Sequence, residues 1–242
     1  MRLPTIQGVI ERRILANYRV DADRLRAILP VPFRPQMVGG LGIAGICLIR
    51  LGHIRPRGMP ALFGVGTENA AHRIAVEWDE GSTLRRGVFI PRRDSSSRLN
   101  ALVGGRLFAG VHHHAKFAVE ETEQNFHIAI ESDDGDTCVR IEAELTDALP
   151  KDSVFGSLSE ASAFFEAGSV GYSSGSKEGS LDGLELRSRE WKVEALRVLR
   201  VESNFFDDLI RFPKGTALFD CALLMRNIAH EWHEREAVLV NR

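Results

Sequence analysis

Three consecutive histidines, His112, His113 and His114, form the most prominent group of chemically capable side chains in the sequence. A neutral imidazole accepts or donates a proton near neutral pH and also binds transition metals. Successive side chains of a strand point to opposite faces, so we expect His112 and His114 to share one face and His113 to take the other. Two histidines about 6.6 Å apart on one face could flank a ligand or share a metal ion.

Two further groups of charged residues could work with these histidines. Glu68 is a lone carboxylate in a segment of small residues, and a carboxylate close to an imidazole can share acid and base roles with it. A guanidinium presents a planar fork that suits carboxylates and phosphates. Five arginines lie within fourteen residues and could bind such a group: Arg85, Arg86, Arg92, Arg93 and Arg98. The alternative interpretation of this arginine cluster is a set of solvated strand ends.

The composition limits the classes of function that the chain can have. Its 242 residues are 44% hydrophobic and 26% charged, which is ordinary for a globular protein. The net charge of −2 gives no basic excess that would favour nucleic acid or anionic lipid, so neither a nucleic acid nor a membrane is expected as partner. Three widely separated cysteines predict no disulfide framework, and without a signal peptide the cytoplasm is the expected compartment.

The elements that must position these residues read mostly as strands. Their pattern predicts one domain over residues 1–242, mainly β (α+β), with antiparallel strands forming a cone or barrel around a central pocket. We expect a long loop over residues 168–183, which is rich in glycine and serine. The expected helices cover 22–29, 158–167 and a segment that begins at Ser95, Ser96 or Ser97 and runs through Leu107. The expected strands are 6–20, 41–51, 73–78, 85–90, 111–121, 124–131 and 137–145, with either two strands or one bent strand within 184–201.

Several segments, taken in order, resemble the acetoacetate decarboxylase-like superfamily, and most closely its uncharacterised bacterial branch. The resemblance rests on the segment from Tyr18 to Pro32, on Thr67-Glu68-Asn69, and on the run from Leu102 into the histidine triplet. It implies a cone-like β fold around a largely closed pocket, often in an oligomer, so we expect a homo-oligomer. In the decarboxylase a lysine forms a Schiff base with a β-keto acid, and a neighbouring cation lowers the pKa of that lysine.

Carried over to this sequence, the resemblance leaves the Schiff-base position without a lysine. Glu68 matches the pocket glutamate, whereas His112, or His113 after a shift of one residue, stands where the reactive lysine would be. Lys116 shares the face of His112 but lies about 13 Å further along the strand. Only five lysines occur in the chain, which leaves few candidates for imine chemistry.

The hypothesis that follows is a protein that binds a small carboxylic or keto acid, with acid–base chemistry in place of a Schiff base. Glu68, His112 and His113 are the expected catalytic residues, and no cofactor or resident metal is expected. The residues expected to bind the substrate are Arg12, Arg92 and His114. Three alternatives stay open: a binding protein without catalysis, a genuine decarboxylase that uses a displaced lysine, and a metal site built from His112, His114 and Glu68.

Overall fold

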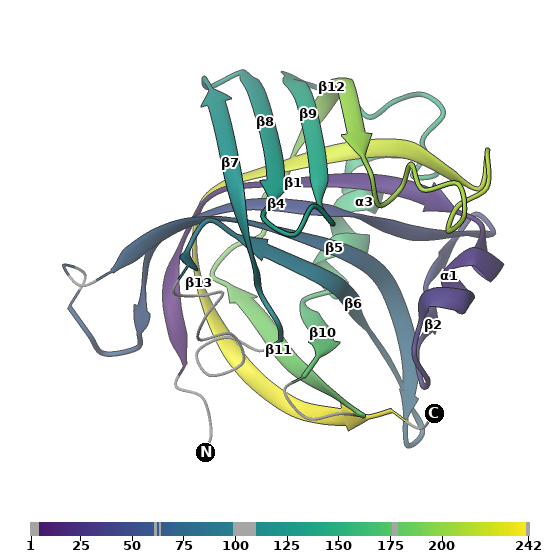
Figure 1. Ribbon diagram of the computed structural model, residues 1–242, viewed down its shortest axis with the longest axis horizontal. Helices are drawn as coiled ribbons and strands as arrows, with labels where there is room; N and C mark the ends of the chain where they lie inside the picture. The colour runs from purple at the N-terminus through teal and green to yellow at the C-terminus, as the bar shows by residue number, and fades with distance from the viewer. Residues whose placement is uncertain (1–4, 61, 63, 99–109, 176–178, 241–242) are drawn as a thin grey trace.

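The computed structural model describes residues 5–60, 62, 64–98, 110–175 and 179–240. Strands dominate these residues, and thirteen of them join in one mixed sheet (Figure 1). The two long helices described are α1 (Ala22–Ile28) and α3 (Leu158–Ala167). The strands are β1 (Ile6–Val20), β2 (Arg34–Pro35), β3 (Met37–Val38), β4 (Leu41–Pro56), β5 (Val65–Glu80), β6 (Thr83–Ser95), β7 (His113–Glu121), β8 (Asn125–Ser132), β9 (Cys138–Thr146), β10 (Val170–Ser174), β11 (Ser180–Ser188), β12 (Glu194–Ser203) and β13 (Ala217–Leu239).

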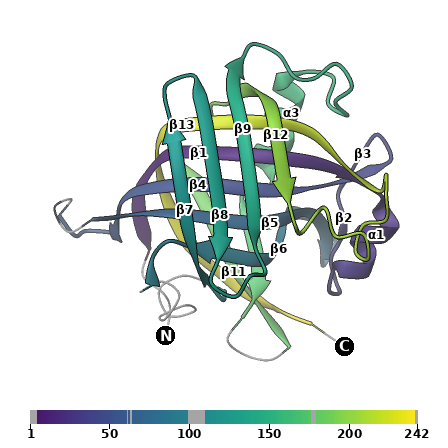
Figure 2. The same cartoon turned by 45° about the horizontal axis from the view of Figure 1, so that its top comes forward.

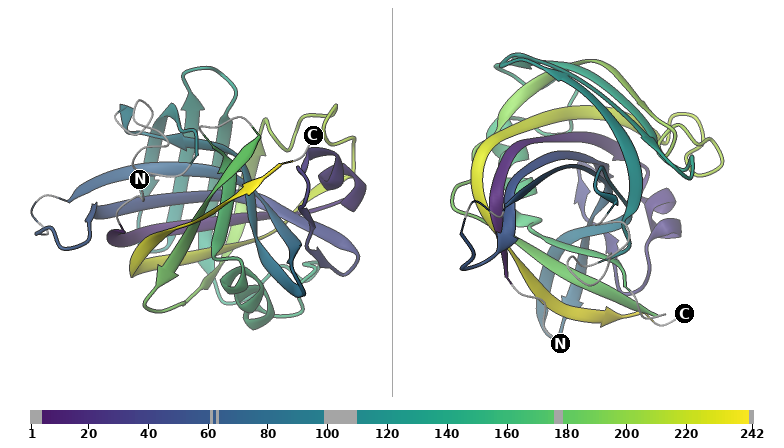
Figure 3. Two further views of the ribbon diagram at one scale, coloured as in Figure 1. Left: turned by 90° about the horizontal axis from the view of Figure 1, so that it is seen from below. Right: turned by 60° about the vertical axis from the view of Figure 1, so that its left-hand side comes forward.

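Seven of these strands close into a ring. The pairings run from β13 through β1, β4, β5, β6, β10 and β11 and return to β13. Figure 3 (right) looks into the bend of this sheet. The side chains that alternate inward along these seven strands therefore face a common interior.

The remaining long strands form a second layer outside the ring. In Figure 2, β7, β8, β9 and β12 cross over β13, β1, β4 and β5. The main hydrophobic core lies between these layers, where Ile14 and Ile46 of the ring pack with Ile130 and Ile141 of the outer strands. Because β4 is covered on both faces, its first half reads as a nearly continuous apolar run, whereas β1 carries polar and charged residues among its apolar ones.

Local sequence signals begin and end the helices. The Asp21 side chain accepts hydrogen bonds from the Asp23 and Arg24 amides and so caps α1. Ser157 caps α3 in the same way by accepting from the Glu160 amide. Phe165 of α3 packs with Leu15 and Cys47, which lie on the inner face of the ring, so α3 covers part of the ring interior.

The structure corrects two sequence-based expectations about the fold. The sheet is mixed rather than purely antiparallel, since β6 pairs in parallel with both β7 and β10. Residues 168–183 are not one long loop, because they contain β10 and the start of β11. Small residues are needed there for close packing: a Cβ at Gly183 would come within 2.7 Å of the Tyr172 ring.

Other expectations agree with the structure or fall outside it. The mainly β class, the strand over residues 6–20, the helices near residues 22–29 and 158–167, and the two strands within 184–201 are confirmed. The helix expected from about Ser95 through Leu107 falls largely outside the described residues. Among the described residues, no helix is long and apolar enough to cross a membrane.

Candidate functional site

A cavity of about 160 Å³ lies inside the seven-strand ring. Every strand of the ring contributes to its wall, and α3 adds Phe165. One lining residue from each strand in ring order is Trp232, Arg13, Cys47, Asn69, Ile90, Gly171 and Leu186. The cavity is therefore a product of ring closure, which brings together residues 13 and 232 from opposite ends of the chain.

Arg13 enters this pocket from β1 with only weak hydrogen-bond acceptors. Its Nε donates to Cys47 Sγ at 3.3 Å, and its Nη1 lies 3.9 Å from Met225 Sδ. The guanidinium also lies 5.9 Å from the centre of the Trp191 ring. Sulfur is a poor acceptor compared with a carboxylate, so this half-buried cation lacks a strong partner among the described residues.

Arg73 is a second pocket cation and is only 5% exposed. Its Nη2 donates to the Asn17 amide oxygen, its guanidinium lies 4.8 Å from the centre of the Phe165 ring, and its Nε has no partner in the described structure. The pKa of Arg73 is lowered to about 10, mainly by burial, and the nearby charge of Arg13 contributes in the same direction. Arg73 is thus a buried cation balanced by dipoles and a ring face rather than by an acid.

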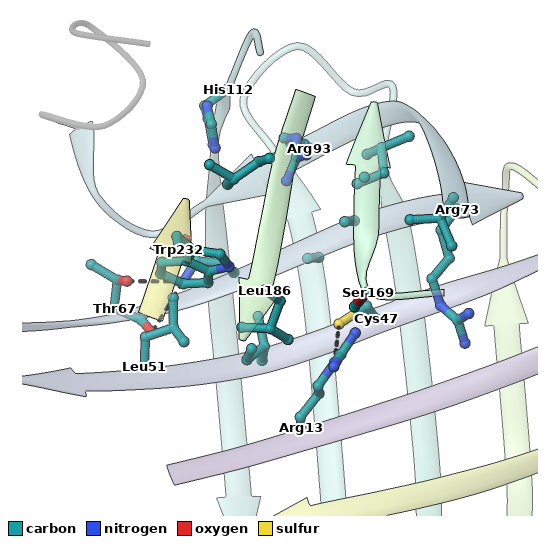
Figure 4. Close-up of a pocket in the computed structure, with 18 of the residues that line it drawn as sticks. Arg13, Cys47, Leu51, Thr67, Arg73, Arg93, His112, Ser169, Leu186 and Trp232 are labelled. Atoms are coloured by element: carbon teal, nitrogen blue, oxygen red, sulfur yellow. Dashed lines mark hydrogen bonds between the residues drawn. The ribbon is translucent and has the colours of Figure 1, made fainter. Parts of the chain in front are cut away.

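Arg93 and His112 line another part of the pocket (Figure 4). Arg93 Nε lies 3.4 Å from Ser173 Oγ, and burial lowers the pKa of this guanidinium to about 10. Burial also lowers the pKa of His112 to about 4, with the Arg93 charge as the next cause. His112 is therefore neutral at pH 7. Its Nδ1 lies 3.2 Å from the Gly110 carbonyl, which assigns the ring proton to that nitrogen.

The acidic side chains do not balance these three arginines. In the described residues none of Arg13, Arg73 and Arg93 forms an ion pair with an aspartate or glutamate. Asp94 reaches the pocket wall, but its carboxylate is occupied by Arg92 at 2.8 Å and by the Thr137 hydroxyl at 2.9 Å. Of the 33 acidic residues of the chain, only Glu178 lies outside the described ranges. The pocket is accordingly rich in uncompensated positive charge.

Glu68 and Arg12 lie on the other face of the ring. Glu68 accepts from Arg12 at 2.6 Å and from Arg50, and Glu121 of β7 pairs with the same two arginines. Neither Glu68 nor Arg12 lines the pocket, whereas their chain neighbours Thr67, Asn69 and Arg13 do. The structure therefore does not bring Glu68 together with His112.

Arg92, His113 and His114 gather outside the pocket around the turn between β8 and β9. Arg92 pairs with Asp94 and Asp134, each at 2.8 Å. His113 lies 3.1 Å from Asp134, and His114 lies 2.8 Å from Asp133. The expectation that His112 and His114 share a face is wrong, because β7 begins only at His113 and His112 precedes the regular strand.

The described residues do not support two of the alternatives, a decarboxylase with a displaced lysine and a metal site built from His112, His114 and Glu68. Lys116, Lys151, Lys192 and Lys214 are all exposed, and no lysine lines the pocket among the described residues. The fifth, Lys177, falls outside the described ranges. No group of three histidine, cysteine or acidic side chains suited to a metal ion occurs in the described part of the chain.

The residues that sequence reasoning missed are one position away from those it selected. Arg13 and Arg93 line the pocket, whereas the expected Arg12 and Arg92 face the other way. A shift of one residue in a strand exchanges its faces, so the face cannot be read without knowing what covers each side. A usable signal was present at Arg73, a charged residue directly before the apolar strand run Ile74-Ala75-Val76 and therefore a candidate for the interior.

The fold matches solved structures over almost the whole chain. An acetoacetate decarboxylase from Legionella pneumophila has a TM-score of 0.65 and 12% identity, with 98% of this chain and 88% of that chain covered. An acetoacetate decarboxylase-like enzyme from Sphingomonas wittichii has a TM-score of 0.60 and 13% identity, covering 100% and 94%. The enduracididine biosynthesis enzyme MppR, complexed with pyruvate, has a TM-score of 0.59 and 10% identity, covering 100% and 91%.

Sequence comparison gives the family. No protein of curated function matches the chain in sequence. Residues 9–214, most of the chain, match DUF2071, which is described as an uncharacterized conserved protein. Together with the shared architecture, this match shows that the chain belongs to the DUF2071 family and has the acetoacetate decarboxylase-like fold.

Proposed function

We propose that this protein binds a small organic acid in the ring pocket, with the acid's carboxylate held by arginine. The observation that carries the proposal is the presence of three pocket guanidiniums, Arg13, Arg73 and Arg93, without an acidic partner in the described structure. A buried cation without a counter-ion is costly, and a bound carboxylate supplies that counter-ion together with charge-assisted hydrogen bonds. The pyruvate named with MppR is a ligand of this chemical class.

His112 is the side chain best suited to act on a bound keto acid. It is neutral at pH 7, and because Nδ1 faces the Gly110 carbonyl, Nε2 is the nitrogen that accepts a proton. The adjacent Arg93 stabilises negative charge that develops when a proton leaves the carbon next to a ketone. We assign to His112 the role of proton acceptor, and we assign no Schiff-base step, since no lysine lines the described pocket.

Binding is tested first, by calorimetry with pyruvate and acetoacetate on the wild-type protein and on Arg13→Met. The variant should bind at least ~10-fold more weakly, because a charge-assisted hydrogen bond contributes about 1.5–3 kcal/mol. Arg85→Met is the matched control, since Arg85 is exposed on β6 and pairs with Glu80. Absence of binding by either acid, or equal binding by Arg13→Met, would overturn the proposal.

Catalysis is tested separately with 2-oxoglutarate, a keto acid long enough to extend from Arg13 toward His112, by following in D₂O the exchange of the protons next to its ketone with NMR. Exchange above the buffer rate that is lost in His112→Gln supports a proton-abstracting enzyme. Binding without exchange supports the alternative, a binding protein on the same fold.

A further inference from the structure

The positive charge of the pocket is divided between two places. Arg13 of β1 and Arg73 of β5 act on one another, since the charge of Arg13 contributes to the lowered pKa of Arg73. Arg93 of β6 acts on His112, and Cys47, the thiol that accepts from Arg13, acts on Arg93 as well as on Arg73. We call Arg13 and Arg73 the β1–β5 pair, and Arg93 with His112 the β6 pair. Figure 4 shows Arg13 and Arg93 on opposite sides of Leu186.

The strand pairing separates Arg93 from the β1 end of the pocket. Arg93 is paired with Ala71, Ala71 with Cys47, and Cys47 with Leu15, so three strand spacings lie between Arg93 and β1. At about 4.8 Å per spacing, the backbones are roughly 14 Å apart along the wall. The side chains reach inward from these strands, and Figure 4 draws the guanidiniums of Arg13 and Arg93 apart. Arg73 lies on β5, next to β6, but its guanidinium is turned toward Asn17 and Phe165. We therefore expect one carboxylate, which spans only two oxygen atoms, to engage the β1–β5 pair or Arg93 but not both.

Apolar side chains line the pocket beside both pairs. Ile49 is the strand partner of Arg13, Ile90 lies on the strand of Arg93, and Leu186 lies between Arg13 and Arg93 in Figure 4. The acidic Asp94 is neutralised by Arg92. A ligand that reaches both pairs therefore passes apolar carbon through the middle and presents negative charge at each end. A ligand with a single charge leaves one of the two arginine groups without a counter-ion.

We propose that the ligand of this pocket is a dicarboxylic acid whose two acidic groups are joined by a short apolar segment. One carboxylate is held by the β1–β5 pair, and the other is held by Arg93. This inference rests on the proposed function, binding of an organic acid, and deepens it by naming the substrate class.

The test compares matched acids on the complete protein by calorimetry at pH 7.5 and constant ionic strength. Succinate, glutarate and adipate are compared with butyrate and valerate, which have one carboxylate, and with inorganic phosphate, which places its charge at a single point. We expect at least one dicarboxylate to bind at least ~10-fold more tightly than both monocarboxylates and phosphate, since one further charge-assisted contact is worth about 1.5–3 kcal/mol.

Two variants test which arginine holds each carboxylate of the ligand. Arg93→Met should weaken the preferred dicarboxylate at least ~10-fold and leave butyrate within about twofold, because only the second carboxylate loses its partner. Arg13→Met should weaken both kinds of acid. The exposed Arg85→Met on the same strand as Arg93 is the control and should change neither.

The outcomes separate this inference from the proposed function. If monocarboxylates bind as tightly as every dicarboxylate, or if Arg93→Met weakens both kinds equally, the two-ended ligand is refuted while acid binding stands. If phosphate binds as tightly as the best dicarboxylate, the ligand is a single-centre anion and the inference also fails. If no acid binds at all, the proposed function itself is overturned.

Discussion

Replacing Arg93 with methionine should make the ligand-free protein more stable and at the same time less responsive to its ligand. Burial lowers the pKa of Arg93 from its usual value to about 10, so the folded state disfavours the charged form. At 1.36 kcal/mol for each tenfold change in proton affinity, the full cost of the charge is about 3 kcal/mol. Since Arg93 is half-buried, solvent screening reduces this cost, and we use about 1–2 kcal/mol.

The contacts that methionine would lose are small by comparison. Arg93 has one long hydrogen bond, 3.4 Å to Ser173 Oγ, worth less than about 1 kcal/mol. The net expectation is therefore a ligand-free variant about 1 kcal/mol more stable than wild type. For a chain of this size, that corresponds to an increase in Tm of about 2–4 °C. Urea unfolding at pH 7.5 measures the free energy directly.

The stability that the protein gains on binding its ligand should be smaller in Arg93→Met than in the wild type. At a glutarate concentration of 100 times the wild-type Kd, the wild type gains about 2.7 kcal/mol of stability. A variant that binds ~10-fold more weakly gains only about 1.4 kcal/mol at the same concentration. Arg85→Met, whose exposed side chain pairs with Glu80, should change both quantities by less than about 0.5 kcal/mol. A ligand-free Arg93→Met more than about 1 kcal/mol less stable than wild type would show that the cation is already compensated, and would refute the reasoning.

Three other predictions use different parts of the molecule. Burial lowers the pKa of His72 to about 3, so the unfolded chain binds the extra proton below pH 6.5 and His72 should lower the stability by about 2 kcal/mol between pH 7.5 and pH 5. The pKa values of His112 and His230 are lowered to about 4, so these two side chains add to the fall in the same range. In urea unfolding, His72→Leu should make the fall about 2 kcal/mol smaller, whereas a variant of the exposed His127 should leave it unchanged. Glu68→Gln should lower the free energy of unfolding by about 1–3 kcal/mol, because Arg12, which is 3% exposed, loses one of its ion-pair partners. Acid binding, measured by calorimetry, should stay within twofold of the wild type. A larger loss of binding would show that Glu68 belongs to the binding site. Alkylation of Cys47 by iodoacetamide, followed by mass spectrometry, should slow when the bound acid fills the pocket, while that of Cys138, which does not line it, should not.

The two faces of the ring differ in their balance of charge, and this difference is why Glu68 and Arg93 are expected to behave differently when replaced. On the outer face, two arginines and two glutamates, Arg12, Arg50, Glu68 and Glu121, neutralise one another completely. On the inner face, the arginines face a cavity and lack acids. The outer cluster is therefore expected to contribute to stability, and the inner one to contribute to binding at a cost in stability.

Local sequence was sufficient for the elements and the class of the fold. The β-branched run of residues 6–20, the caps at Asp21 and Ser157, and the Asp-Gly turn between β8 and β9 each act over a few residues, and each appears where the pattern predicts it. The small residues of 168–183 misled the interpretation, because their role is to let β10 and β11 pack closely against distant side chains such as Tyr172.

By itself, the sequence determined that the chain is mainly β, that arginine and histidine are the candidates for pocket chemistry, and that lysine is scarce. Only the tertiary structure decided which member of each adjacent pair enters the pocket: Arg13 rather than Arg12, and Arg93 rather than Arg92. The physical reason is that neighbouring strand residues differ by one face, and both faces of β1 are covered, so local hydrophobicity does not distinguish them. The pocket itself exists only once β11 pairs with β13 and closes the ring, a contact between segments some fifty residues apart.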